Sequence, residues 1–76
     1  MINKIIKYIK EDDLIIKYIN NSVNIVNYDN ILEINDHEIT VIKDKKIILI
    51  KGKDLKLNKL LDSEILITGI INKIEL

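Results

Sequence analysis

Short apolar segments separated by polar residues make up most of this 76-residue chain. From Leu14 onward the segments are rich in isoleucine, and each is bounded by Asn, Asp, Gly or Lys. Isoleucine is β-branched and suits pleated strands, and polar breaks every eight to ten residues or so are typical of antiparallel β-structure. The expected strands are 14–19, 22–26, 31–34, 38–42, 46–50, 55–57, 64–68 and 70–76.

The first ten residues follow a different period. Isoleucines within residues 2–9 recur at the spacing of one helical face, and lysines stand off that face. Acidic residues at 11–13 are unfavourable at a helix C-terminus, so we expect the helix to end there. The pattern predicts a short amphipathic helix and loop at 1–13 and a single β domain at 14–76. Whether the helix packs on the sheet, on a membrane or on a partner is left open.

The predicted fold is therefore all-β, a small antiparallel sandwich or meander of about seven or eight short strands with the N-terminal helix. The run "KIILIK" is apolar without interruption from Ile47 to Ile50, which predicts a central strand covered on both faces. In "LKLNKL", Leu55 and Leu57 alternate with polar residues, which predicts a half-exposed strand.

The two glycines and one asparagine are expected to be structural positions. Gly52 lies between "KIILI" and "LKL", where a two-residue hairpin turn requires positive φ. Gly69 interrupts the apolar run "ILITGII", so we expect a bend from which a final strand starts. Asn27 opens the first of three polar turns, which are expected at 27–30, 35–37 and 43–45.

The residue types that carry reaction chemistry are scarce. The chain has no cysteine and one histidine, His37, and its serines lie in predicted turns. We therefore expect no catalytic residue, no cofactor site, no metal site and no enzymatic activity. A domain of this size buries only about 60% of its unfolded surface, so dense aliphatic packing or self-association must support it.

The apolar runs are too short to cross a bilayer, and the N-terminus lacks the pattern of a signal peptide. We therefore expect a cytoplasmic protein with no direct membrane span. Net charge is zero, which argues against a dedicated nucleic-acid binder.

The charges are nevertheless segregated along the chain. An acidic block contains Asp29, Glu33, Asp36 and Glu38. A basic block follows, with Lys43, Lys45, Lys46, Lys51, Lys53, Lys56 and Lys59. The blocks are either solvated strand faces or complementary patches that guide association with a copy or a partner. An alternative function is a peripheral membrane or nucleic-acid-binding module that uses residues 43–59.

The three tyrosines, Tyr8, Tyr18 and Tyr28, fit core edges or interface anchors better than base-stacking platforms, because no basic groove surrounds them.

The C-terminal part of the chain, from "KIILIKGKDL" onward, resembles the YabP/YqfC family of bacterial sporulation proteins. The family pattern is an apolar strand closing in Gly, a Leu-x-Ile/Leu strand, an Ile-x-Ile-x-Gly strand and a final Ile-rich strand. The matching positions here are Gly52, Leu55, Leu57, Leu60, Ile65, Ile67, Gly69, Ile70 and Ile74. Asn27 matches an upstream asparagine of the YqfC branch. The resemblance runs from about Leu14 to Leu76, with a lysine in place of one turn glycine, no proline and a shorter N-terminus.

This resemblance implies a non-enzymatic β-sandwich that acts in the mother cell during endospore formation. The expected function is that of an assembly or adaptor protein in spore envelope formation. The implied partner is a protein, such as a sporulation membrane protein. Association with further copies of this chain is expected instead from the small core and the segregated charges. The sequence itself contributes the charge blocks, which we expect at the interface.

Overall fold

The computed structural model describes residues 13–76, and its regular structure consists of six antiparallel strands. They are β1 (Ile15–Ile19), β2 (Ser22–Val26), β3 (Asn30–Ile34), β4 (Glu38–Lys43), β5 (Lys46–Leu60) and β6 (Glu64–Glu75). One continuous sheet joins them in the order β1-β2-β6-β5-β4-β3. The prediction of an all-β antiparallel fold is confirmed. The expected N-terminal helix lies outside the described residues.

The strand count is six rather than seven or eight, because two pairs of predicted segments are joined. β5 unites 46–50 with 55–57, and β6 unites 64–68 with 70–76. The pairing of these two long strands shifts register at several points along their length. Such irregularities bend a strand and increase its twist without ending it. The polar and glycine interruptions in this half of the sequence therefore mark bends within strands.

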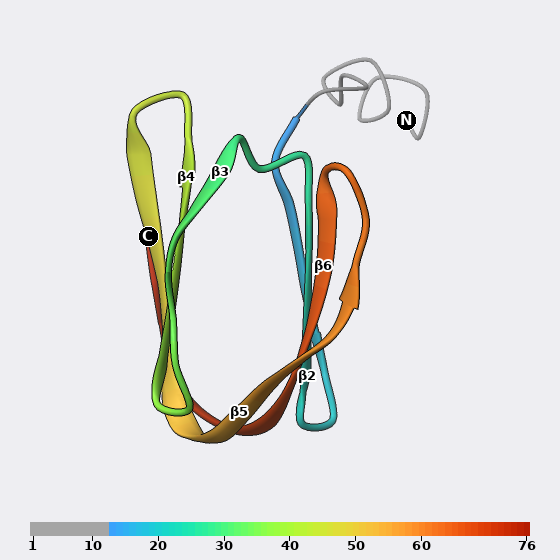
Figure 1. Cartoon of the computed structure of the whole chain (residues 1–76), viewed down its shortest axis with the longest axis vertical. Coiled ribbons are helices and arrows are strands. Elements are labelled where there is room, and N and C mark those ends of the chain that lie inside the picture. Colours follow the sequence, from blue (N-terminus) through green and yellow to red (C-terminus); the bar gives the residue numbers. More distant parts are fainter. Residues whose placement is uncertain (1–12) are drawn as a thin grey trace, which may run out of the picture.

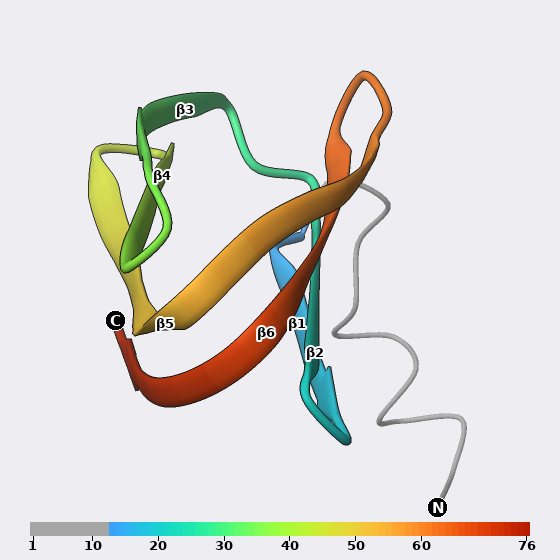
Figure 2. The same cartoon turned by 60° about the horizontal axis from the view of Figure 1, so that its bottom comes forward.

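β5 and β6 bend together, so that the sheet folds over and its two halves face each other (Figure 1). The first layer contains β1, β2, the beginning of β6 and the end of β5. The second layer contains the end of β6, the beginning of β5, β4 and β3. Figure 2 shows the two long strands running side by side from one layer to the other. One sheet thus supplies both layers of the sandwich.

The core lies between the two layers and is almost entirely aliphatic. Alternation along each strand directs every second side chain inward. The fully buried members are Val23, Ile25, Ile39, Val41, Ile48, Ile50, Ile65 and Ile67. Leu55 and Tyr28 are also buried, and Leu57 packs against the core. Each such side chain stabilises the fold by about 1.5–3 kcal/mol through the area it removes from water.

Gly52 is not in a hairpin turn, and the prediction of positive φ there is wrong. The residue lies inside β5, where the pairing of that strand with β6 shifts register. A Cβ atom at this position would come within 1.9 Å of the carbonyl oxygen of Ile70. The Gly52 amide donates a hydrogen bond to the His37 carbonyl at 3.1 Å. Close backbone approach, rather than a turn, explains the glycine.

Gly69 occupies the matching position on β6. Its φ is 133°, and a Cβ atom there would lie 2.6 Å from the carbonyl oxygen of Asp54. Asp54 itself has a φ of 53°. The expected bend is therefore present, but the strand continues through it instead of starting anew. Each long strand has its glycine where the other strand's backbone comes closest.

Two of the three predicted polar turns, 27–30 and 43–45, contain residues in left-handed geometry. Asn27 has a φ of 69°, its amide donates to the Ser63 carbonyl at 2.6 Å, and its side chain donates to the Asp13 carbonyl at 2.8 Å. Asp44 and Lys45 form the two-residue loop between β4 and β5, with φ values of 49° and 68°. Positive φ at both loop positions is the mark of a type I′ hairpin turn.

Candidate functional site

The outward side of the second layer carries an exposed apolar surface. Thr40 is paired with Leu49, and Ile42 is paired with Ile47, across β4 and β5. Directly paired residues in antiparallel strands project to the same face, here the face opposite Ile39 and Val41. Exposed Leu32 lies at the bulge of β3, next in sequence to Glu33, which is paired with Thr40. We define the outer patch as Leu32, Thr40, Ile42, Ile47 and Leu49.

The exposure of this patch is greatest at two of its apolar corners. Ile47 is 55% exposed and Leu32 is 51% exposed. Thr40 lies at the centre and is only 8% exposed, since neighbouring side chains cover it. Its hydroxyl donates to a carboxylate oxygen of Glu38 at 3.3 Å. The patch therefore combines an ordered centre with apolar side chains that remain open to solvent.

The run "KIILIK" was predicted to be a central strand covered on both faces, and the structure corrects half of this. The segment is central, since it pairs with both β4 and β6. Ile48 and Ile50 are buried in the core, but Ile47 projects outward and is exposed. A strand with apolar residues on both faces is usual where both faces are covered. Among residues 13–76, only the inward face has a cover.

Charged residues border the outer patch in a polarised arrangement. Acids lie on the side of β3 and β4, where Glu33 is paired with Thr40, and Glu38 stands on the same face. Lysines lie on the other side, since Glu38 pairs with Lys51, and Lys51 pairs in turn with Lys73 on β6. Lys73 also lies 3.1 Å from Glu75. The apolar centre thus has an acidic flank and a mainly basic flank.

The acidic block predicted as an interface is divided by local contacts. Asp29 accepts a hydrogen bond from the Asp44 amide at 2.9 Å and lies 3.8 Å from the Lys43 ammonium. Asp36 lies 3.0 Å from the His37 ring in an exposed turn. Only Glu33 and Glu38 border the outer patch. Asp29 instead fixes the end of the β4–β5 hairpin, and Asp36 contacts only the neighbouring His37 ring in the contacts described for its side chain.

The basic block does not form one surface. Lys43, Lys45 and Lys46 lie at the β4–β5 hairpin end. Lys51 faces outward from the second layer, but β5 then changes layer. Lys56, opposite Thr68, consequently projects from the first layer. Lys53, opposite Ile70, lies at the bend between the layers. The bend of β5 separates lysines that are close in sequence.

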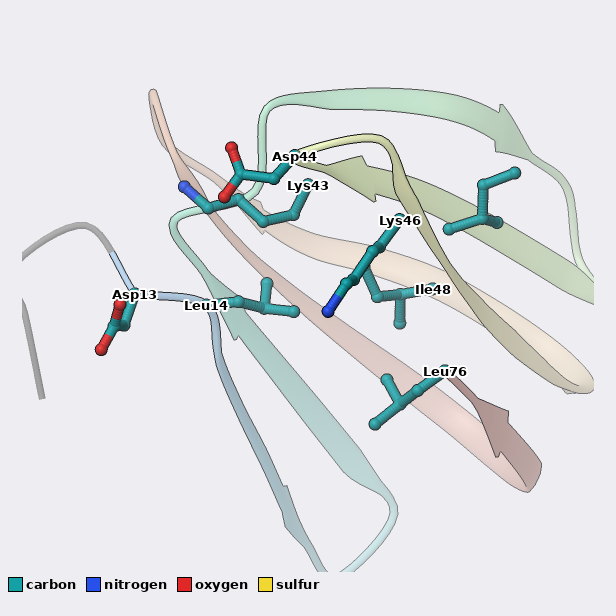
Figure 3. A pocket seen from close by; sticks show the side chains of 8 residues that line it. Asp13, Leu14, Lys43, Asp44, Lys46, Ile48 and Leu76 are labelled. Carbon is teal, nitrogen blue, oxygen red and sulfur yellow. The ribbon is translucent and has the colours of Figure 1, made fainter. Parts of the chain in front are cut away.

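A recess opens between the two layers at the hairpin end. It has a volume of about 330 Å³ and is lined by four apolar and four charged residues from both layers, Ile47 among them. Figure 3 shows Leu14, Lys46, Ile48 and Leu76 turned toward this common space. Lys43 and Asp44 stand at its rim. The recess is continuous with the end of the core, so its lining extends the packing between the layers.

Tyr28 closes the core beside the loop that joins β5 and β6. Burial raises the pKa of its hydroxyl above the ordinary value of 10.0, and the negative charge of Asp62 adds to this effect. The prediction of a core-edge role is confirmed for Tyr28. Tyr18 on edge strand β1 is instead largely exposed, and Tyr8 lies outside the described residues.

Among residues 13–76, no three His, Cys, Asp or Glu side chains gather in a group that could hold a metal ion. The same part of the chain contains no helix with the length and apolarity to cross a membrane. Comparison of the chain with protein-family models, with curated proteins and with solved structures gave no match. The resemblance to the YabP/YqfC sporulation proteins stays a prediction.

Sequence reasoning missed the outer patch as a site. The signal was present, because Ile42 and Ile47 fall out of phase with the buried positions of their own strands. From sequence alone, the run from Ile47 to Ile50 is interpreted as buried within the domain, and Ile42 has no interpretation of its own. The alternative explanation is burial against another molecule. The register of β4 and β5 favours it, because it sets Ile42 and Ile47 side by side on the outward face.

Proposed function

We propose that this protein is a non-enzymatic assembly module that acts by binding another protein chain through the outer patch. The observation that carries the proposal is the exposure of Ile47 and Leu32 on an ordered sheet face whose strands are apolar on both sides. Exposed apolar side chains with a charged border are typical of protein–protein contact surfaces. The charges on the two flanks would orient the partner and speed its encounter.

The resemblance to the YabP/YqfC family suggests the setting of this assembly. Under that reading the module works in the cytoplasm of the mother cell and contributes to the spore envelope. Its partner would be another copy of the chain or a membrane protein of the sporulating cell. The alternative function, membrane or nucleic-acid binding through residues 43–59, has less support because β5 distributes those lysines over both layers.

Site-specific photo-crosslinking in the cells that make the protein tests the proposal. A photoreactive residue is placed at Ile47 or Leu32 on the outer patch. A matched control is placed at Lys17, which is exposed on the outward side of the first layer. We expect protein adducts of defined mass from positions 47 and 32 and none from position 17. Equal yields at all three positions, or no protein adduct at any of them, would refute the proposal.

A further inference from the structure

We infer that the outer patch is self-complementary and that its partner is a second copy of this chain, packed face to face. The two copies would be related by a two-fold axis that lies in the interface between their sheets. The axis runs parallel to the strands, above the line between β4 and β5. This inference rests on the proposed function and names its partner. It follows from the order in which the outward residues are arranged across the second layer.

The outward residues of β4 and β5 form three rows. The register sets Ile42 beside Ile47, Thr40 beside Leu49, and Glu38 beside Lys51. A two-fold axis between the strands and parallel to them exchanges the two members of each row between copies. Ile42 then faces Ile47 of the second copy, and Thr40 faces its Leu49. Two isoleucines therefore meet in the first row, and in the second row Leu49 meets the small, polar Thr40.

The third row supplies charge complementarity. Under the same axis Glu38 faces Lys51 of the second copy, and its Lys51 faces Glu38 in return, so each dimer gains two opposite-charge contacts. Lys51 takes part in none of the ion pairs found among residues 13–76. At the rim, Glu33 approaches Glu75 of the second copy, and Lys73 offsets this repulsion because it lies 3.1 Å from Glu75.

The orientation of the axis is decided by the same rows. A two-fold axis in the plane of the interface but across the strands would set Ile42 against Glu38 of the second copy. It would likewise set Ile47 against Lys51. Burying charges against apolar side chains is costly, so this arrangement is disfavoured. The axis parallel to the strands also agrees with the aligned packing of sheets, which keeps strand directions within about 30°.

The size of the patch makes the dimer a weak one. Four strands, each about 4.8 Å wide, cover about 19 Å, and the five residues from Ile47 to Lys51 span about 14 Å, which is four rises of roughly 3.4 Å. The flat area is then about 260 Å² per copy, well below the roughly 800 Å² per partner of a standard stable interface. We therefore expect association at high concentration that reverses on dilution.

Charge reversal provides the test, by sedimentation velocity of the full chain from about 10 µM to about 1 mM at low salt. Lys51→Glu leaves only acids in the third row, and Glu38→Lys leaves only lysines. Each variant alone should dimerise at least about tenfold more weakly than the wild type, because both contacts in the dimer become repulsive. Mixed in equal amounts, the two variants should form a heterodimer with wild-type affinity, because every contact is again opposite in charge.

Two further variants keep the test interpretable. Lys56→Glu makes the same charge change on the first layer and should dimerise like the wild type. Ile47→Lys should abolish dimerisation, and unfolding curves of each variant establish that the fold is intact. A monomeric wild type at 1 mM or so, or single variants that dimerise unchanged, would overturn the inference. Cellular adducts at position 47 to a different protein, with a monomeric wild type, would overturn self-association while supporting the proposed function.

Discussion

Replacing Gly52 with alanine adds one methyl group at the point where the pairing of β5 with β6 shifts register. The new Cβ would lie 1.9 Å from the carbonyl oxygen of Ile70 and 3.0 Å from a side-chain carbon of Leu55. Ordinary contact between a Cβ atom and another heavy atom begins near 3.4 Å. The backbones of β5 and β6 must therefore separate by about 1.5 Å (3.4 minus 1.9) at this position. Because the obstructing atom belongs to the backbone of a paired strand, no rotamer change relieves the contact.

The expected cost is large relative to the stability of so small a domain. Overpacking that side chains can accommodate costs about 1–3 kcal/mol, so a backbone clash should cost about 3 kcal/mol or more. At about 0.05–0.15 kcal/mol per residue, the whole chain has about 4–11 kcal/mol of stability. The Tm should fall by about 12–24 °C, using about 4–8 °C per kcal/mol for a domain of this size.

Thermal and urea unfolding followed by circular dichroism measure this effect, and a second substitution identifies its cause. Asparagine tolerates positive φ, so Gly52→Asn would retain most of the stability if a left-handed turn were the reason for glycine. Because close approach is the reason, we expect Gly52→Asn to be at least as destabilising as Gly52→Ala. Lys53→Ala, at the exposed neighbouring position, serves as the control. A near-wild-type Gly52→Asn would refute the reasoning.

Three further predictions follow from other parts of the structure. Lys45→Gly should raise the free energy of unfolding by about 0.5–1 kcal/mol. The reason is that Lys45 has a left-handed φ of 68° in the type I′ turn, which glycine adopts without steric strain. An unchanged midpoint of urea unfolding would contradict this. Tyr28 has a raised pKa, so its contribution to stability should be complete below its unfolded value of about 10 and be lost as pH rises through the folded pKa. Tyr28→Phe should remove this alkaline decline in urea unfolding measured from about pH 9 to about pH 12, and an identical decline in the variant would refute the assignment. Anionic liposomes and oligonucleotides should not retain the protein at physiological salt, since β5 places Lys51 and Lys56 on different layers; retention lost on substituting both lysines would favour the alternative function.

Much of the fold was predictable because the alternation of apolar and polar residues along a strand reflects which of its sides is buried. The inward positions of β2 and β4, such as Ile25 and Val41, follow directly from alternation. The joining of short segments into β5 and β6 was not predictable in the same way. It depends on the contact between Gly52 and Ile70, which are eighteen positions apart. The residues next to a glycine do not show whether it lies in a turn or against the backbone of a distant strand.

The candidate site was predictable only in part, for a related physical reason. The charge blocks were visible in the sequence, but the change of layer within β5 sends Lys56 away from Lys51. The Asp29 carboxylate contacts Asp44 and Lys43 of the β4–β5 hairpin and does not border the outer patch. The outer patch emerges only when the register sets Ile42 beside Ile47 on a face that the rest of residues 13–76 leaves uncovered.

The central claim is that this protein associates through the outward face of its second layer. Amide chemical shifts of the ¹⁵N-labelled full chain, recorded from dilute to concentrated solution, test it most directly because they locate the contact as well as detect it. We expect concentration-dependent shifts at Thr40, Ile42, Ile47 and Leu49, with amides on the outward side of β1 and β2 unchanged. Spectra that do not change with concentration, or shifts confined to β1 and β2, would contradict the account.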